Sequence, residues 1–168
     1  MSQTIVAPSN EKPVYPTVFL GGGITNCPDW QKEVCEFLEE DNITLLNPRR
    51  EEFDINDKTA THQQIDWEFK RLERCDVFTM FFCKGDSLQP ICMYELGRNI
   101  VRMQNRFPTT WNRRIIITIE PGYKRADDVF LQTFFATDNR VRPSYGDVFV
   151  HEMTIAGKVR ELERDGEI

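Results

Sequence analysis

Four short runs of continuous apolar residues alternate with longer segments in which apolar residues recur every three or four positions. The continuous runs cover residues 17–20, 43–46, 77–82 and 115–119. Their apolar side chains do not alternate with polar ones, so both faces should be covered, as in strands of a parallel sheet. Turn-forming residues close two of the runs, at Asn47-Pro48 and Pro121-Gly122.

The segments between these runs have the period of helices. They predict helices over 30–38, from near Thr61 to residue 72, over 92–103, over 129–135 and within 146–163. Asp29 is expected to cap the first helix, and Pro90 to lie in the first turn of the third. Residues 49–61 are predicted to form a polar loop. Strands that alternate with helices predict an α/β sandwich with a central parallel sheet of four to five strands.

The chain has 168 residues, of which 40% are hydrophobic and 29% charged. These values are typical of one globular domain. Residues 1–13 are polar and contain two prolines, which predicts a flexible N-terminal arm before a single domain over 14–168.

The formal net charge of -6 argues against a nucleic-acid partner. No apolar run approaches the roughly 20 residues of a membrane span, and the N-terminus lacks the pattern of a secretion signal. The five cysteines form no CxxC pair, so we expect a reduced, cytoplasmic protein without structural zinc. Cys75, Cys83 and Cys92 are interpreted as packing residues.

In a parallel α/β fold the ligand binds outside the carboxyl ends of the strands. The first such end is the glycine turn Gly21-Gly22-Gly23, where the backbone can approach a ligand closely. These glycines lack the GxGxxG spacing of a dinucleotide site, so a tight turn without a ligand is an equal alternative.

Two carboxylates are candidates for chemistry. Glu68 lies at the edge of the apolar stripe formed by Ile65 and Phe69, and Glu95 lies in the second turn of the helix that begins near Pro90. A helix start favours an ionised Glu95, and partial burial favours a neutral Glu68. Ion pairs with nearby arginines are the structural alternative for each carboxylate alone.

Further polar groups follow the other strands. Ser87 and Gln89 precede the Glu95 helix, where they either bind an oxygen-rich ligand or cap the helix. Arg49 either binds a phosphate or carboxylate or is neutralised by nearby acids. The two histidines, His62 and His151, have no partners at ligand spacing, so neither a metal site nor a nucleophilic triad is expected.

Several segments between Val18 and Arg102 resemble successive motifs of the nucleoside 2-deoxyribosyltransferase-like family. The segments are Phe19-Leu20-Gly21-Gly22-Gly23-Ile24, Asn47-Pro48-Arg49-Arg50, Gln64-Ile65-Asp66-Trp67-Glu68, Cys75-Asp76-Val77, Ser87-Leu88-Gln89-Pro90-Ile91 and Tyr94-Glu95-Leu96-Gly97-Arg98. The resemblance implies a flavodoxin-like three-layer sandwich and cleavage of N-glycosidic bonds in nucleosides or nucleotides.

The resemblance also implies roles for individual residues. Glu95 matches the nucleophile that attacks C1′ of the deoxyribose, and Glu68 stands where the family usually has an aspartate that protonates or orients the base. Phe19 replaces a tyrosine, and Asp86 is the acid nearest to the position of a sugar-binding aspartate. Asn47 and Tyr94 belong to the matching motifs and are expected at the substrate.

The resemblance implies no cofactor, a small nucleoside or nucleotide and a nucleobase as partners, and a homodimer or larger assembly. Transfer of deoxyribose to another nucleobase is the first hypothesis. Hydrolysis of a nucleoside or a nucleoside 5′-monophosphate and a non-catalytic nucleotide-binding module are the alternatives.

Overall fold

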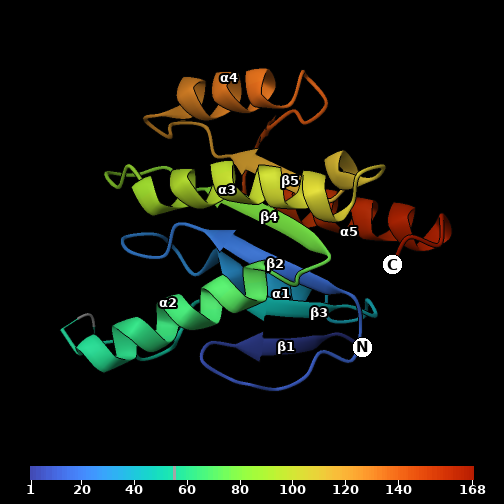
Figure 1. The fold of residues 1–168 in the computed structure, drawn as a ribbon. Coiled ribbons are helices and arrows are strands. Elements are labelled where there is room, and N and C mark those ends of the chain that lie inside the picture. Colours follow the sequence, from blue (N-terminus) through green and yellow to red (C-terminus); the bar gives the residue numbers. More distant parts are fainter. Residues whose placement is uncertain (55) are drawn as a thin grey trace.

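A single all-parallel sheet runs through the computed structural model, which describes residues 1–54 and 56–168 (Figure 1). In these residues the sheet has six strands in the order β1-β3-β2-β4-β5-β6. The strands are β1 (Gln3–Val6), β2 (Thr17–Gly22), β3 (Thr44–Asn47), β4 (Val77–Phe82), β5 (Ile115–Ile119) and β6 (Ser144–Tyr145). The predicted parallel α/β sheet is therefore confirmed, and it has more strands than the four to five expected.

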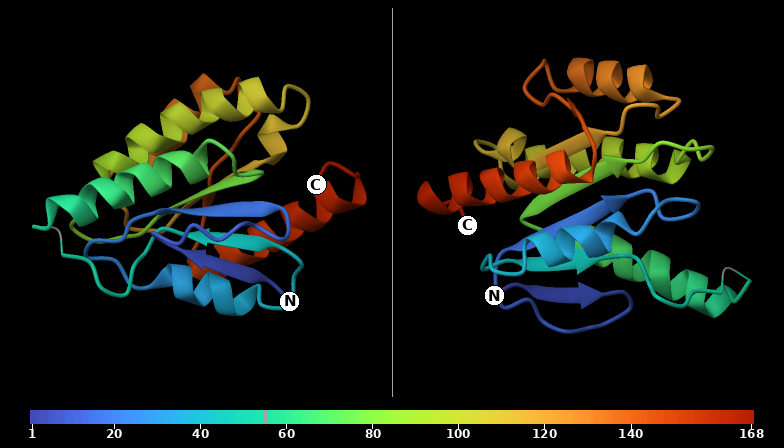
Figure 2. Two further views of the ribbon diagram at one scale, coloured as in Figure 1. Left: turned by 60° about the horizontal axis from the view of Figure 1, so that its bottom comes forward. Right: turned by 180° about the vertical axis from the view of Figure 1, so that it is seen from behind.

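Helices cover both faces of this sheet (Figure 2). In chain order they are α1 (Trp30–Phe37), α2 (Lys58–Leu72), α3 (Pro90–Arg106), the short 3-10 helix η1 (Trp111–Arg113), α4 (Ala126–Ala136) and α5 (Val148–Arg164). Side chains of α2, α3 and α4 join the core on one face, and those of α1 and α5 join the core on the other. This arrangement confirms the flavodoxin-like three-layer sandwich.

Strand β4 shows why the apolar runs are continuous. All six of its residues are buried. Phe78, Met80 and Phe82 belong to the core beneath α2 and α3, whereas Val77 and Phe81 belong to the core beneath α1 and α5. Successive side chains of a strand point to opposite faces, so a strand with two covered faces buries every position, and the one polar side chain of β4, Thr79, donates its hydroxyl to the Phe19 carbonyl at 2.9 Å.

The first strand lies in the segment that the sequence predicts to be a loose arm. Residues Gln3 to Val6 pair in parallel with β3, and the side chain of Ile5 is buried. The prediction is therefore wrong for these residues. Four residues are too few to show a period, and it is β3 that supplies both the hydrogen bonds and the apolar cover for β1.

Helix α2 begins earlier than predicted. The Asp57 carboxylate accepts hydrogen bonds from the backbone N–H groups of Thr59 and Ala60, at 2.8 and 3.2 Å. This cap starts the helix at Lys58, so residues 58–61 of the predicted polar loop are helical. Residue 55 of that loop lies outside the described residues.

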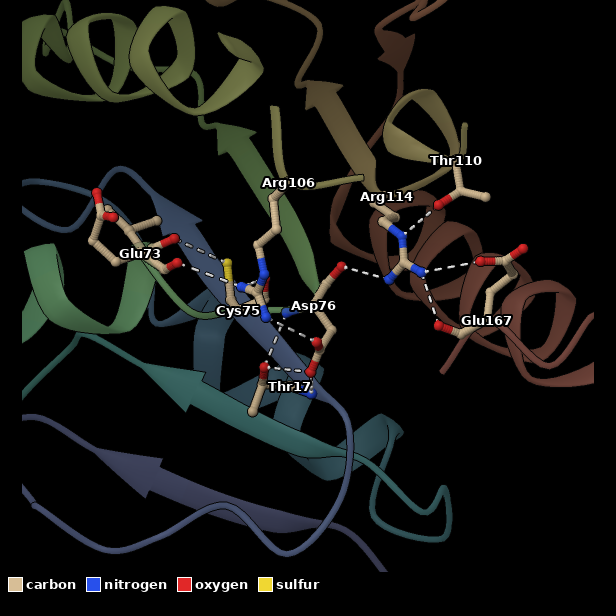
Figure 3. Close-up of polar contacts among 9 residues, drawn as sticks. Thr17, Glu73, Cys75, Asp76, Arg106, Thr110, Arg114 and Glu167 are labelled. Carbon is tan, nitrogen blue, oxygen red and sulfur yellow. Dashed lines mark hydrogen bonds and ion pairs between the residues drawn. The ribbon is translucent and has the colours of Figure 1, made fainter. Parts of the chain in front are cut away.

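A polar network joins the starts of β2 and β4 to the end of the chain (Figure 3). Thr17 donates to the Asp76 carboxylate through its backbone N–H and its hydroxyl, each at 2.9 Å. The buried Arg114 donates to the Asp76 carbonyl at 3.1 Å and to the Glu167 carbonyl at 2.8 Å. These contacts fix the edge of the sheet opposite to the carboxyl ends of the strands.

Two of the cysteines that were expected to be unpaired form a disulfide. Cys27 follows β2 and Cys83 follows β4, and their sulfur atoms are bonded. The interpretation of Cys83 as a packing residue is therefore wrong. The two residues are 56 positions apart in the chain, and only the pairing of β2 with β4 brings their loops together. Cys75 and Cys92 are buried free thiols, as expected of packing residues.

Candidate active site

A cleft of about 240 Å³ opens at the carboxyl ends of the two central strands. From β2 the chain moves to β3 on one side of the sheet, and β4 pairs on the other side of β2. The connections leaving these strands therefore diverge, and such a switch point is where parallel α/β sheets bind ligands. Eight of the predicted site residues line this cleft: Phe19, Gly21, Gly22, Gly23, Glu68, Ser87, Gln89 and Glu95.

Glu68 extends from α2 to one wall of the cleft. Its Oε1 atom accepts a hydrogen bond of 2.7 Å from the side-chain amide of Gln64, one helical turn earlier. Burial raises the pKa of Glu68, while the hydrogen bond from Gln64 and the positive charge of Arg50 lower it. Gln64 and Arg50 therefore leave the pKa of Glu68 lower than burial alone would make it.

Glu95 comes from the second turn of α3 and lines the same cleft. Burial, and then the negative charge of Glu68, raise the pKa of Glu95 to about 7. The charges of Arg98 and Arg102 act in the opposite direction. In the described part of the chain, Glu95 forms no ion pair with either arginine, so the structural alternative considered for this carboxylate does not apply.

The protonation states expected of Glu68 and Glu95 from the sequence differ from those that their surroundings favour. We expected an ionised Glu95 and a neutral Glu68, yet the pKa of Glu95 is the one that reaches about 7. Glu95 lies beyond the first turn of α3, where the helix dipole has weakened, and burial outweighs it. Burial and the facing Glu68 therefore favour the protonated form of Glu95, whereas Glu68, whose pKa burial also raises, has a hydrogen-bond donor and a nearby cation that favour its ionised form.

The glycines at the end of β2 are required by close packing against neighbouring residues. Gly21 and Gly22 belong to the strand itself and not to a turn after it. Gly22 has φ +150°, and a Cβ there would lie 2.4 Å from the Phe81 carbonyl oxygen. At Gly23 a Cβ would lie 2.6 Å from Oε1 of Gln89. Close packing against β4 and Gln89 explains why larger residues are absent.

Gln89 forms another wall and presents a free acceptor. The residue is buried and has a left-handed backbone conformation, with φ +48°. Its Nε2 donates to the Cys83 carbonyl at 2.7 Å, and its buried Oε1 accepts no hydrogen bond among the described residues. Its side chain does not cap α3, which removes the capping alternative for Gln89. Oε1 can therefore accept a hydrogen bond from a hydroxyl or N–H of a ligand.

Four predicted site residues lie outside the cleft: Asn47, Arg49, Asp86 and Tyr94. Asn47 is buried and accepts a hydrogen bond from the backbone of Arg49. The Arg49 guanidinium donates to two backbone carbonyls and forms a 3.6 Å ion pair with Asp29. Asp86 is exposed and pairs with Lys124, and Tyr94 is exposed on α3. The structure gives these four residues local partners and does not bring them to the two carboxylates.

Sequence reasoning missed other residues that shape the cleft. Thr25, Pro48, Ile91 and Cys92 also line it. Burial and the two nearby carboxylates raise the pKa of the Cys92 thiol to about 12, so this cysteine is neutral. Pro48 belongs to the motif Asn47-Pro48-Arg49-Arg50, and its position directly after a strand is the signal that identifies it.

His151, the one histidine in the core, does not reach the cleft. It lies between Trp30 and Phe81, and its Nδ1 is 2.8 Å from the hydroxyl of Thr118. Burial lowers the pKa of His151 to about 3, so the ring is neutral. Within residues 1–54 and 56–168, no cluster of three or more His, Cys, Asp or Glu side chains is arranged to hold a metal ion.

A comparison with known families agrees with this geometry. A family described as nucleoside 2-deoxyribosyltransferase like matches residues 15–108, more than half of the chain. The chain belongs to the nucleoside 2-deoxyribosyltransferase-like family. The matched segment runs from β2 to the end of α3 and so contains every residue that lines the cleft. No curated protein matches the chain.

None of the helices in the described ranges combines the length and apolar character that a bilayer crossing requires.

Proposed function

We propose that this protein cleaves the N-glycosidic bond of 2-deoxynucleosides and transfers the deoxyribose to a second nucleobase. The observation that carries the proposal is the pair formed by Glu68 and Glu95. The two carboxyls line one cleft, burial raises the pKa of both, and the negative charge of Glu68 raises that of Glu95 further. Paired carboxyls of this kind cleave glycosidic bonds in other enzymes.

In the first step, an ionised oxygen of Glu95 attacks C1′ and the bond between C1′ and the base nitrogen breaks. The bonding electrons go to the base, which takes the proton of the pair through Glu68. The products are a deoxyribosyl ester of Glu95, a neutral base and an ionised Glu68, so atoms and charge balance. The attack requires an ionised Glu95 and a protonated Glu68, so a proton held on Glu95 passes to Glu68 before the attack.

In the second step, a different nucleobase enters the cleft and the reaction runs in reverse. A ring nitrogen of the base attacks C1′, the ester bond to Glu95 breaks, and the N–H proton of the base returns to the pair through Glu68. Two displacements at the same carbon keep the configuration at C1′. Gln89, Ser87 and the glycines of β2 lie around the same cleft and are placed to hold the sugar.

Base release from a panel of deoxynucleosides tests the proposal. We expect Glu95→Ala to abolish release, whereas Glu40→Ala, which alters an exposed glutamate far from the cleft, should behave as wild type. Equal release from wild type and Glu95→Ala would reject the role of Glu95.

The acceptor distinguishes transfer from its alternatives. With a deoxynucleoside and a second base, transfer yields a new deoxynucleoside, and release of the first base depends on the second. Release that does not depend on an added base would show hydrolysis. Tight nucleoside binding without release, by wild type as well as by the variant, would show a non-catalytic binding module.

The protein is further proposed to act as a homodimer or larger assembly. Exposed apolar side chains gather on α2 and α3 beside the cleft, at Ile65, Phe69, Ile91, Tyr94 and Val101. The Arg98 guanidinium lies over the rings of Phe69 and Tyr94, at 5.0 and 5.8 Å, and joins these residues into one surface. Such a surface is typical of a protein interface.

Sedimentation measures this assembly directly. At micromolar concentration we expect a mass of at least two chains, and we expect Val101→Glu to lower it, since a charge would be buried in the interface. A wild-type mass of one chain would contradict the assembly.

A further inference from the structure

The side chain of Gln64 joins Glu68 to the end of a neighbouring strand. Its Nε2 donates one hydrogen bond of 2.6 Å to the Pro48 carbonyl and another of 2.7 Å to Oε1 of Glu68. Pro48 follows β3, so the amide is anchored to the sheet at one end and to the carboxylate at the other. Gln64 itself does not line the cleft.

The orientation of this amide follows from its partners. Both of its neighbours are oxygen acceptors, so the side chain must present its NH2 group to both of them. Its Oε1 is buried and has no hydrogen-bond partner among the described residues. The cost of that unpaired oxygen is offset by two short bonds, one of which is to a carboxylate.

We propose that Gln64 is a positioning residue for Glu68: its amide holds the Glu68 carboxylate at the cleft as an ionised acceptor and so leaves the proton of the pair on Glu95. The catalytic meaning of this inference rests on the proposed function, but the placement of the proton can be measured without turnover. The step that starts the reaction is then the transfer of that proton from Glu95 to Glu68.

Other charges also act on this pair. Arg50, from the segment after β3, lowers the pKa of Glu68, and Arg98 and Arg102 of α3 lower the pKa of Glu95. The Cys92 thiol of α3 is neutral near pH 7. Arg50, Arg98 and Arg102 each favour an ionised carboxyl, and none makes a hydrogen bond or ion pair with Glu68 in the described residues. Gln64 is the direct contact that distinguishes one carboxyl from the other.

A structural role for Gln64 is the competing explanation. The bond to Pro48 ties α2 to the sheet, and losing it would loosen the cleft wall. Loosening would admit water, which weakens the effect of burial and lowers the pKa of both carboxyls. Loss of the donor to Glu68 has a different signature: the pKa of Glu68 rises, and the pKa of Glu95 falls because its neighbour is less charged.

Nuclear magnetic resonance of glutamate labelled with carbon-13 at the carboxyl carbon separates these explanations. The wild-type chain, Gln64→Met and Gln104→Met would be titrated from acid to alkaline pH, with Glu68→Gln and Glu95→Gln to assign the two signals. Methionine keeps the length of glutamine without its donor, and Gln104 is a glutamine of α3 with no contact to the pair. Gln64→Asn, too short to reach Glu68, replaces Gln64→Met if that variant fails to fold.

In Gln64→Met we expect the midpoint of Glu68 to rise and that of Glu95 to fall, with no change in Gln104→Met. The acid side of the pH profile of kcat/KM should move to higher pH as the midpoint of Glu68 rises. An unchanged midpoint of Glu68, or a fall of both midpoints, would overturn the role of Gln64. Absence of turnover in the wild type would instead reject the proposed function and leave the titration result valid.

Discussion

Replacing Glu95 by glutamine should change how the stability of this protein depends on pH. In the folded state, burial and the charge of Glu68 raise the pKa of Glu95 from 4.5 to about 7. The folded chain therefore binds this proton more tightly than the unfolded chain does. The stability that the proton contributes is fully present below about pH 4.5 and is lost as the pH rises through about 7.

The size of the effect follows from that pKa shift. The difference between 4.5 and about 7 is about 2.5 pH units, and each unit corresponds to about 1.4 kcal/mol. The wild type should therefore lose ~3 kcal/mol of folding free energy between pH 4.5 and pH 8 through this group alone. Glutamine does not titrate, so Glu95→Gln should not show this loss.

Urea unfolding at several pH values between 4.5 and 8 provides the assay. Groups other than Glu68, which faces Glu95, titrate in the same way in both proteins, so the difference in unfolding free energy between variant and wild type reports mainly on Glu95. We expect this difference to grow by ~3 kcal/mol in favour of the variant across the range. If the difference for Glu95→Gln stays constant with pH, the reasoning about the buried pair is refuted.

Three further predictions concern the framework around the cleft. Gly22→Ala should lower the unfolding free energy by ~2 kcal/mol or more, measured by urea unfolding, because its Cβ would collide with the Phe81 carbonyl at φ +150°. Replacing Cys27 and Cys83 by serine should cost ~4 kcal/mol of stability without reductant, from the loop closed by the disulfide, and nothing when reductant is present in both samples. Arg114→Ala should cost ~3 kcal/mol in the same assay, because it removes a fully buried side chain together with its hydrogen bonds to Thr110 and to the carbonyls of Asp76 and Glu167, and a loss below 1 kcal/mol would contradict this account.

Much of the fold could be predicted because long elements carry their own periodic signal. The continuous apolar run at 77–82 indicated a strand covered on both faces, and β4 has every residue buried. Strands β1 and β6 were missed for the opposite reason. They have four and two residues, and neighbouring strands complete them. The Cys27–Cys83 disulfide was missed because sequence spacing does not show which loops lie together.

The sequence by itself determined the layered α/β fold, the family motifs and the two candidate carboxylates, Glu68 and Glu95. These depend on residue types and short spacings, which local periodicity and motifs preserve. Only the tertiary structure shows that the pKa of Glu95 rises to about 7, because burial and the charges of facing helices set a pKa and neither can be read from spacing. Tertiary packing also separates Gln89, which lines the cleft with a buried, unpaired acceptor, from Arg49, which pairs with Asp29, a residue 20 positions earlier in the chain.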